Sequence, residues 1–184
     1  MLRNLAKLLR CRRRDISRFR AAQQGATAVE FALIAPAFLG TLIAVFEVTI
    51  YLFAQQTLQT AAVETGRLIM TGQAQNANLT QSQFANDVCP LIQALFTCSK
   101  LMINVQSYAS FSAANPSAPT LTYNANGSVS NTWSYSLGSP GQVMIVQLIY
   151  QWPIVGGPLG FTLTPLGNGT TEIMGVSAFR IEPY

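Results

Sequence analysis

The sequence predicts an α+β protein in which one long N-terminal helix crosses a membrane and precedes a short helical segment and an antiparallel sheet. Three observations predict this fold. A basic block in residues 1–25 precedes a long apolar run, helical spacing of apolar residues continues beyond that run, and the spacing changes to two from Leu101 onwards. The predicted organisation is a leader at 1–25, a membrane and stalk helix at 26–71, and an α+β domain at 72–184.

The charge distribution predicts how the chain lies across the membrane. Residues 1–25 contain eight basic residues and one acid, whereas the remainder contains three basic residues and six acids. The apolar run 31–53 is long enough to cross a hydrocarbon core of about 30 Å. By the positive-inside rule the N-terminus is cytoplasmic and the C-terminal domain is exported. This rule explains the basic block, so we expect no nucleic-acid partner.

The leader meets the apolar run at Gly25-Ala26-Thr27-Ala28-Val29-Glu30-Phe31. Glycine at this boundary allows a membrane peptidase to approach the backbone closely. Cleavage after Gly25 makes Ala26 the first residue and Glu30 the fifth. A secretory signal peptidase requires an apolar core of about 7 to 15 residues before its small-residue site, and neither condition holds here. The junction resembles the processing site of type IV pilin-like proteins, which implies that leader 1–25 is removed and that the apolar segment stays in a bacterial inner membrane with the C-terminal domain in the periplasm.

The segment 25–69 resembles the TadE-like family of minor pseudopilins of the tight-adherence (Tad, Flp) pilus system. The resemblance is carried by Gly25 with Ala28-Val29-Glu30-Phe31, Pro36, Glu47, Ala54-Gln55-Gln56 and the stretch from Glu64 to Arg67. A looser similarity covers the pair Cys89 and Cys98 and the C-terminal stretch from Phe179 to Tyr184. The resemblance implies processing by a prepilin peptidase and a role in Tad pilus assembly and adhesion. Its implied partners are TadE-, TadF- and TadG-like subunits, the Tad inner-membrane platform and, as a further candidate, the major pilin.

Glu30 is the candidate assembly residue. An ionisable group inside an apolar helix costs at least about 2.5 kcal/mol and therefore needs a partner. The resemblance implies that Glu30 of one subunit meets the new α-amino group of Ala26 in a neighbour and sets the register of the packed helices. Two alternatives remain open: Glu30 pairs with its own Ala26 amine, or it reaches the cytoplasmic interface. Glu47 lies about 25 Å further along the helix and is expected to be an interfacial acid.

Helical spacing continues from the apolar run to about Met70, with Gln55, Gln59 and other polar residues opposite the apolar face. Gly72 and the following Gln/Asn-rich stretch are expected to end this helix. A second helical region then begins with a capping box formed by Thr80 and Gln83. Its predicted apolar face consists of Phe84, Val88, Leu91 and Leu95. Pro90 is expected to split this region.

Cys89 and Cys98 both lie in the predicted periplasmic domain, where the compartment permits a disulfide. A straight helix would separate their Cα atoms by roughly 13 Å, so a bond requires the chain to bend between them. Pro90 supplies a reason for the bend. The alternative is a pair of free, buried cysteines. Cys11 belongs to the leader and is expected to be a reduced, incidental thiol.

Three strands are predicted in the C-terminal half. The first begins at Leu101, where apolar and polar residues alternate; the second is Val143 to Trp152; and the third is Thr170 to Ile181, which Gly175 interrupts. The connection 112–141 is long enough to contain a hairpin, and Asn126-Gly127 marks its turn. The apolar connection 156–169 either folds back on the sheet or presents a patch to a partner.

The sequence predicts no enzyme, cofactor or metal site. The chain contains no histidine, and the acids beyond the stalk, Asp87, Glu172 and Glu182, are dispersed along the sequence. The alternative to a pilus subunit is a permanently anchored periplasmic assembly or binding factor that never enters the fibre. A membrane-tethered enzyme is a third hypothesis, which a cluster of acids around a deep pocket would support.

Overall fold

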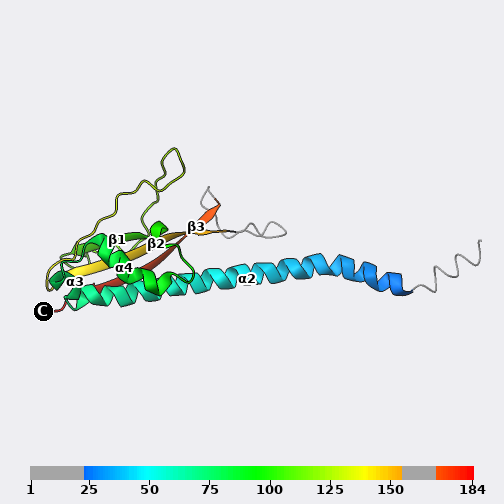
Figure 1. The fold of residues 1–184 in the computed structure, drawn as a ribbon, viewed down its shortest axis with the longest axis horizontal. Helices are drawn as coiled ribbons and strands as arrows, with labels where there is room; N and C mark the ends of the chain where they lie inside the picture. Colours follow the sequence, from blue (N-terminus) through cyan, green and yellow to red (C-terminus); the bar gives the residue numbers. More distant parts are fainter. Residues whose placement is uncertain (1–22, 155–168) are drawn as a thin grey trace, which may run out of the picture. The chain divides into compact units, whose positions relative to one another are not determined.

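The computed structural model describes residues 23–154 and 169–184 (Figure 1). The fold is α+β, with a long apolar N-terminal helix, short helices and a small antiparallel sheet, as the sequence predicted. The elements are α2 (Gln23–Met70), α3 (Gln73–Asn76), α4 (Gln81–Ile92), the 3-10 helix η1 (Cys98–Lys100), β1 (Met102–Tyr108), β2 (Val143–Pro153) and β3 (Thr170–Arg180). Contacts divide the chain into residues 1–45 and residues 46–184, and each unit is described separately.

Helix α2 has 48 residues and continues through Pro36. Its C-terminal end matches the sequence prediction, because Gly72 adopts a left-handed conformation with φ of 77°. The C-terminal stretch of the chain closes this end of the helix: the Glu182 N–H donates to the Met70 carbonyl at 2.9 Å. The Tyr184 ring packs where a Cβ of residue 72 would lie. Glycine is therefore required at residue 72 both by the backbone and by this contact.

Helix α4 begins as predicted and continues further than predicted. The Thr80 hydroxyl accepts from the Gln83 N–H, and the Gln83 side chain accepts from the Thr80 N–H, which completes the capping box. The prediction that Pro90 splits this region was wrong. Pro90 lies in the last turn of α4, two residues before its end at Ile92, where a proline costs little because the helix is already ending.

The apolar face of α4 was predicted one residue out of phase in its second half. Phe84, Val88 and Ile92 are completely buried and repeat every four residues, whereas Leu91 is 41% exposed. The chain bends after Ile92, whose carbonyl accepts from the N–H groups of Leu95 and Phe96. This turn brings the Cα atoms of Cys89 and Cys98 to 5.7 Å, and the two residues form a disulfide. The required bend is therefore present, but it follows the helix instead of starting at Pro90.

The sheet has the order β1-β2-β3 with both pairs antiparallel. Ile103 lies opposite Leu148 in the first pair, and Leu148 lies opposite Gly175 in the second. The three strands correspond to the three predicted ones. Gly175 does not interrupt β3, which continues through it from Thr170 to Arg180.

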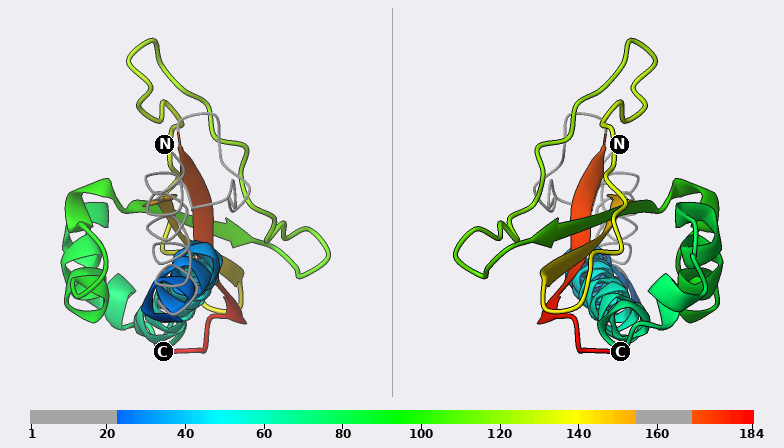
Figure 2. Two further views of the ribbon diagram at one scale, coloured as in Figure 1. Left: turned by 90° about the vertical axis from the view of Figure 1, so that its right-hand side faces the viewer. Right: turned by 90° about the vertical axis from the view of Figure 1, so that its left-hand side faces the viewer.

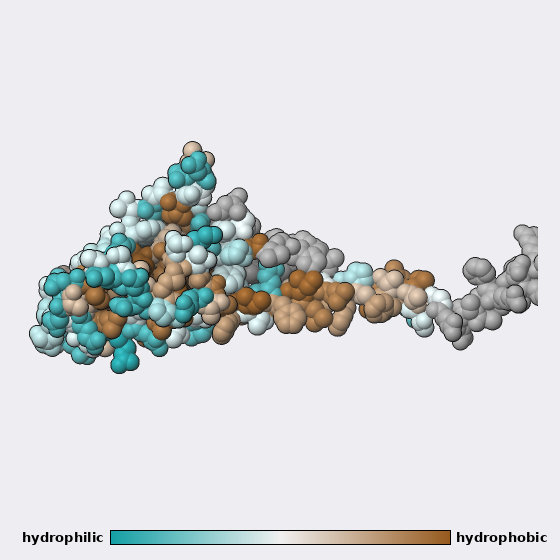
Figure 3. Space-filling view, viewed as in Figure 1, coloured by the Kyte–Doolittle hydropathy of each residue, from teal (hydrophilic) through white to brown (hydrophobic). Residues whose placement is uncertain are grey.

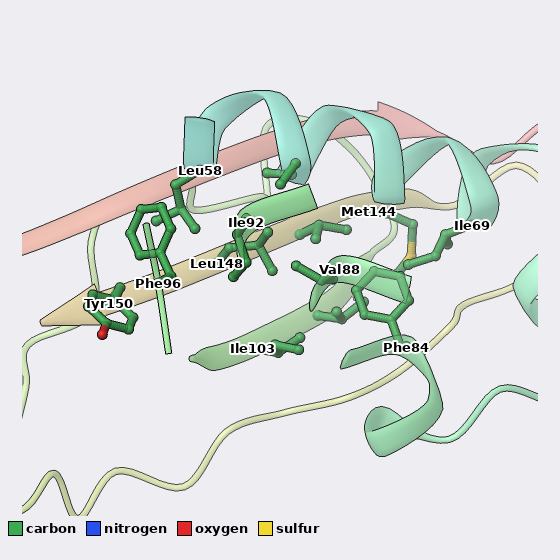
Figure 4. Packing of buried hydrophobic residues seen from close by; sticks show 14 of the residues in the cluster. Leu58, Ile69, Phe84, Val88, Ile92, Phe96, Ile103, Met144, Leu148 and Tyr150 are labelled. Carbon is green, nitrogen blue, oxygen red and sulfur yellow. The ribbon is translucent and has the colours of Figure 1, made fainter. Parts of the chain in front are cut away.

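The core lies between one face of this sheet and the helices (Figures 2 and 4). Helix α2 contributes Leu58 and Ile69, while α4 and the turn after it contribute residues such as Phe84 and Phe96. From the sheet, alternate residues point into the same cluster: Ile103, Val105, Met144, Val146, Leu148, Tyr150 and Ile173. The Phe96 ring meets the Tyr150 ring edge to face at a centroid distance of 4.9 Å. The period-two pattern in β2 thus selects the face that packs against the helices.

The opposite face of β2 is also buried, which the sequence did not indicate. Gln147 is only 4% exposed. Its amide donates to the carbonyl of Ser117, and its carbonyl accepts from the Asn104 side chain at 2.7 Å. Asn104 in turn accepts from the Ser134 N–H. These bonds hold both ends of the long connection 112–141 near the sheet.

The same connection contains the predicted hairpin, because Tyr123 and Val129 form an antiparallel bridge around Asn126-Gly127. Most of the connection 156–169, whose role the sequence left open, lies outside the described residues.

Candidate functional site

The first half of α2 presents large apolar side chains to its surroundings instead of burying them. Phe31 is 72% exposed and Leu33 is 74% exposed. Figure 3 shows the apolar residues gathered along this helix. Within the described residues one helix, Gly25–Met70, is long and apolar enough to cross a membrane. In water this surface would be costly, because each large apolar side chain gains about 1.5–3 kcal/mol on burial.

Gly25 and Ala26 both lie in the first turns of α2, and both are exposed. A Cβ added to Gly25 would meet no atom of the described residues within 4 Å, and the glycine does not have a positive φ. The local fold of this chain therefore does not require glycine at residue 25.

Glu30 is exposed on the same helix, four residues after Ala26. Residues four apart on a helix share a face, so Glu30 and Ala26 lie on one side of α2. Small residues, including Ala32 and Gly40, follow on this apolar stretch of the helix.

Among the residues that the structure describes, two acids have buried carboxylate oxygens without a hydrogen-bond partner. They are Glu47, where both oxygens are buried, and Glu172, where one is. Glu172 is the third residue of β3, and burial raises the pKa of its carboxyl above the ordinary value. Sequence reasoning treated Glu47 as an interfacial acid and did not single out the environment of Glu172. The one feature of the sequence that could have indicated this environment is the apolar connection 156–169, which lies just before Glu172.

Two glutamines of α2 bind the edge of the sheet, which sequence reasoning missed. The Gln59 side chain donates to the Val176 carbonyl at 2.8 Å and accepts from the Val176 N–H at 2.9 Å, as a neighbouring strand would. Gln55 donates to the Met174 carbonyl at 2.7 Å. The two glutamines are four residues apart, so they lie on one face of α2 and reach successive outward-facing residues of β3. Their spacing was the available signal, but the sequence gave no indication of the partner strand.

Gly175 allows α2 to lie this close to β3. An added Cβ at Gly175 would collide with the Leu58 carbonyl of α2. At Gly66 an added Cβ would meet the Phe179 ring at 2.9 Å. One glycine on each element thus gives the helix and strand room to pack together.

One depression on the described surface, with a volume of about 490 Å³, is lined by Lys100, Ser128, Tyr150 and Gln151 among others, with no acid. The described residues hold no cluster of three or more His, Cys, Asp or Glu side chains suited to a metal.

Tyr135 has a pKa raised to about 12, chiefly by burial and secondarily by Asp87, so its phenol stays protonated at neutral pH.

Comparison with known families gives one match, and it lies on helix α2. The model of the family described as TadE-like protein matches residues 25–67. This match covers under a quarter of the 184-residue chain. Neither a curated protein nor a solved structure gives a significant match.

Proposed function

Residues 25–67 are TadE-like, and we propose from this match that the protein is a membrane-anchored minor pseudopilin of a Tad (Flp) pilus system. The match lies on α2, begins at Gly25 and ends three residues before the end of the helix at Met70. It thus includes the membrane candidate, the predicted cleavage site and both glutamines that bind β3. The proposed role is structural: the protein helps to initiate or cap pilus assembly and so supports adhesion.

In the proposed topology the basic leader remains in the cytoplasm, the exposed apolar part of α2 crosses the inner membrane, and the sheet domain lies in the periplasm. The leader carries eight of the eleven basic residues of the chain, which supports this orientation. The disulfide between Cys89 and Cys98 also suits an oxidising compartment.

A prepilin peptidase removes leader 1–25 in this proposal and leaves Ala26 as the new N-terminus. Glu30 then meets the Ala26 amine of a neighbouring subunit within the apolar layer. A desolvated ion pair is a poor source of stability but a good determinant of register, because any other alignment leaves both charges unpaired. The expected neighbours are TadE-, TadF- and TadG-like subunits, the inner-membrane platform and the major pilin.

Replacement of Gly25 by valine tests the processing step. We expect Gly25→Val to leave the full-length mass in membrane extracts, whereas the wild-type protein yields a chain whose first residue is Ala26. Ala32→Val is the matched control, since it adds the same branched side chain to an exposed residue of the same helix. A normal mature N-terminus in Gly25→Val would contradict cleavage at this bond.

The pilus role is tested separately by where the cleaved protein accumulates. We expect the cleaved chain in pili sheared from intact cells. If the chain is cleaved but remains wholly in the membrane fraction while pili form normally around it, the protein is an anchored assembly factor and not a fibre subunit.

A further inference from the structure

We infer that the Gly25–Ala26 bond is protected from hydrolysis while the first turns of α2 are helical, and that Gly25 promotes processing by weakening these turns. The inference deepens the proposed function and rests on it, because it concerns the same bond. The structural basis is that α2 begins at Gln23, so residues on both sides of the bond are helical. The two residues are also exposed, so burial within this chain does not protect the bond.

Helical geometry withholds the carbonyl that a peptidase must use. In an α-helix the Gly25 carbonyl accepts from the Val29 N–H. In hydrolysis the oxygen of a water molecule bonds to the Gly25 carbonyl carbon, and the bond from that carbon to the Ala26 nitrogen breaks. Both protons of the water end on this nitrogen, leaving a carboxylate on Gly25 and an ammonium on Ala26. The peptidase stabilises the developing oxyanion with its own donors, so the bond from Val29 has to open first.

The chain does not need Gly25 for its own fold. Among residues 23–154 and 169–184 an added Cβ meets nothing within 4 Å, and the backbone does not have the positive φ that favours glycine. The glycine therefore acts either on the partner that cuts the chain or on the stability of the helix end. In a helix, glycine is less favourable than alanine by an amount that corresponds to about a fivefold change in population. The change acts on the turn that contains the scissile bond.

A purely steric role for Gly25 predicts the same loss of cleavage in Gly25→Ala, and a rescue experiment separates the two. Ala28 lies inside the loop closed by the bond from Val29 to Gly25, whereas Ala32 lies one turn beyond it. Both alanines are exposed in the same helix, so Ala28→Gly and Ala32→Gly remove the same methyl group without removing packing within this chain. Only Ala28→Gly weakens the turn that contains the scissile bond.

The experiment measures the initial rate of cleavage of the full-length chain in membrane vesicles that contain the prepilin peptidase, with the product identified by mass. We expect Gly25→Ala to slow cleavage at least fivefold. Adding Ala28→Gly should restore about fivefold, and adding Ala32→Gly should restore less than twofold. Hydrogen exchange of the Val29 amide in the uncut protein should change in the same order, becoming slower in Gly25→Ala and faster again when Ala28→Gly is added.

The outcomes distinguish this inference from the proposed function. If the wild-type chain is not cut after Gly25, the proposed processing itself is wrong. If the wild-type chain is cut and Ala28→Gly restores nothing, or restores no more than Ala32→Gly, then Gly25 acts only by steric access and the inference is overturned. Restoration of both cleavage rate and amide exchange by Ala28→Gly alone supports it.

Discussion

Single residues determine how closely the long helix approaches the sheet. Gly175 lies where an added Cβ would collide with the backbone of α2 at Leu58. Gln59 binds both backbone groups of Val176 on the next residue of the same strand. The missing side chain of Gly175 and the side-chain amide of Gln59 therefore both favour close packing of α2 against β3. The glycine permits the approach, and the glutamine satisfies the backbone groups that an edge strand would otherwise leave unpaired.

We expect Gly175→Ala to destabilise the domain by about 1–3 kcal/mol, because the new methyl group must displace the backbone of α2 and not a flexible side chain. Thermal unfolding of the detergent-solubilised full chain, followed by near-ultraviolet circular dichroism, measures the effect. Ala178→Val is the matched control: it enlarges an exposed residue of the same strand and should change stability by less than about 0.5 kcal/mol. Equal effects of the two substitutions would contradict a close contact at Gly175.

Glu172 provides a prediction on pH. Burial raises the pKa of its carboxyl in the folded protein, so folding favours the protonated form. Its contribution is fully favourable below the unfolded pKa and is lost as the pH rises through the folded pKa. Glu172→Gln should therefore raise the melting temperature at pH 7 and have little effect near pH 3. The gain should be under about 1 kcal/mol, because the side chain is only partly buried. A lower melting temperature at pH 7 would show that the carboxylate has a stabilising partner.

At the scale of elements, features that depend on neighbouring residues were predicted correctly. Contacts between residues far apart in the sequence were not predicted. The glycine after α2, the capping box of α4 and the alternation in β2 depend on residues close in sequence, and each was predicted. The prediction for Pro90 was wrong because the effect of a proline depends on where the helix ends. The prediction for Leu91 was wrong because its burial depends on which face of α4 the sheet covers. The contact from Gln59 to β3 joins residues 117 apart, and no local pattern specifies such a partner.

The same holds for the candidate site. The junction around Gly25, the apolar span and Glu30 are contiguous in sequence, so the pattern was visible without a structure. The exposed state of Gly25 and its position within α2 needed coordinates, because sequence alone does not show whether a glycine is demanded by the chain's own packing. The burial of the Glu47 carboxylate oxygens likewise could not be predicted, because it depends on atoms that lie around the helix and are not local in sequence.

The disulfide is the covalent link between α4 and η1, and it closes a short loop across the turn after Ile92. Replacing both Cys89 and Cys98 by serine should lower the free energy of unfolding by roughly 2.5–3 kcal/mol in the chain-entropy treatment of a loop this short. Reductant should destabilise the wild-type protein by a similar amount and leave the double variant unchanged. Non-reducing mass mapping of native protein should show the two cysteines in one bonded peptide pair. Two alkylatable thiols at these positions in exported protein would contradict the prediction.

At the scale of the whole molecule, the family match links the apolar part of α2 with the part that packs on the sheet. Residues 25–67 include Glu30, where a charge lies in an apolar stretch, and Gln55 and Gln59, where the helix binds β3. Helix α2 thus includes both the proposed assembly charge and, further along the chain, the glutamines that bind β3.

We therefore predict that Glu30→Gln leaves cleavage and membrane insertion intact but impairs pilus assembly. The amide keeps the size of the side chain and removes the charge that meets the Ala26 amine of a neighbour. An ammonium left without its partner costs roughly 3–5 kcal/mol if it is buried, and under about 1 kcal/mol at an exposed interface. Mature mass and membrane fractionation report processing and insertion, and the amount of sheared pili reports assembly. Glu64→Gln is the control, because it makes the same change on an exposed residue of α2 beyond the apolar run. Wild-type piliation with normally cleaved Glu30→Gln would show that Glu30 is an interfacial acid without a role in register.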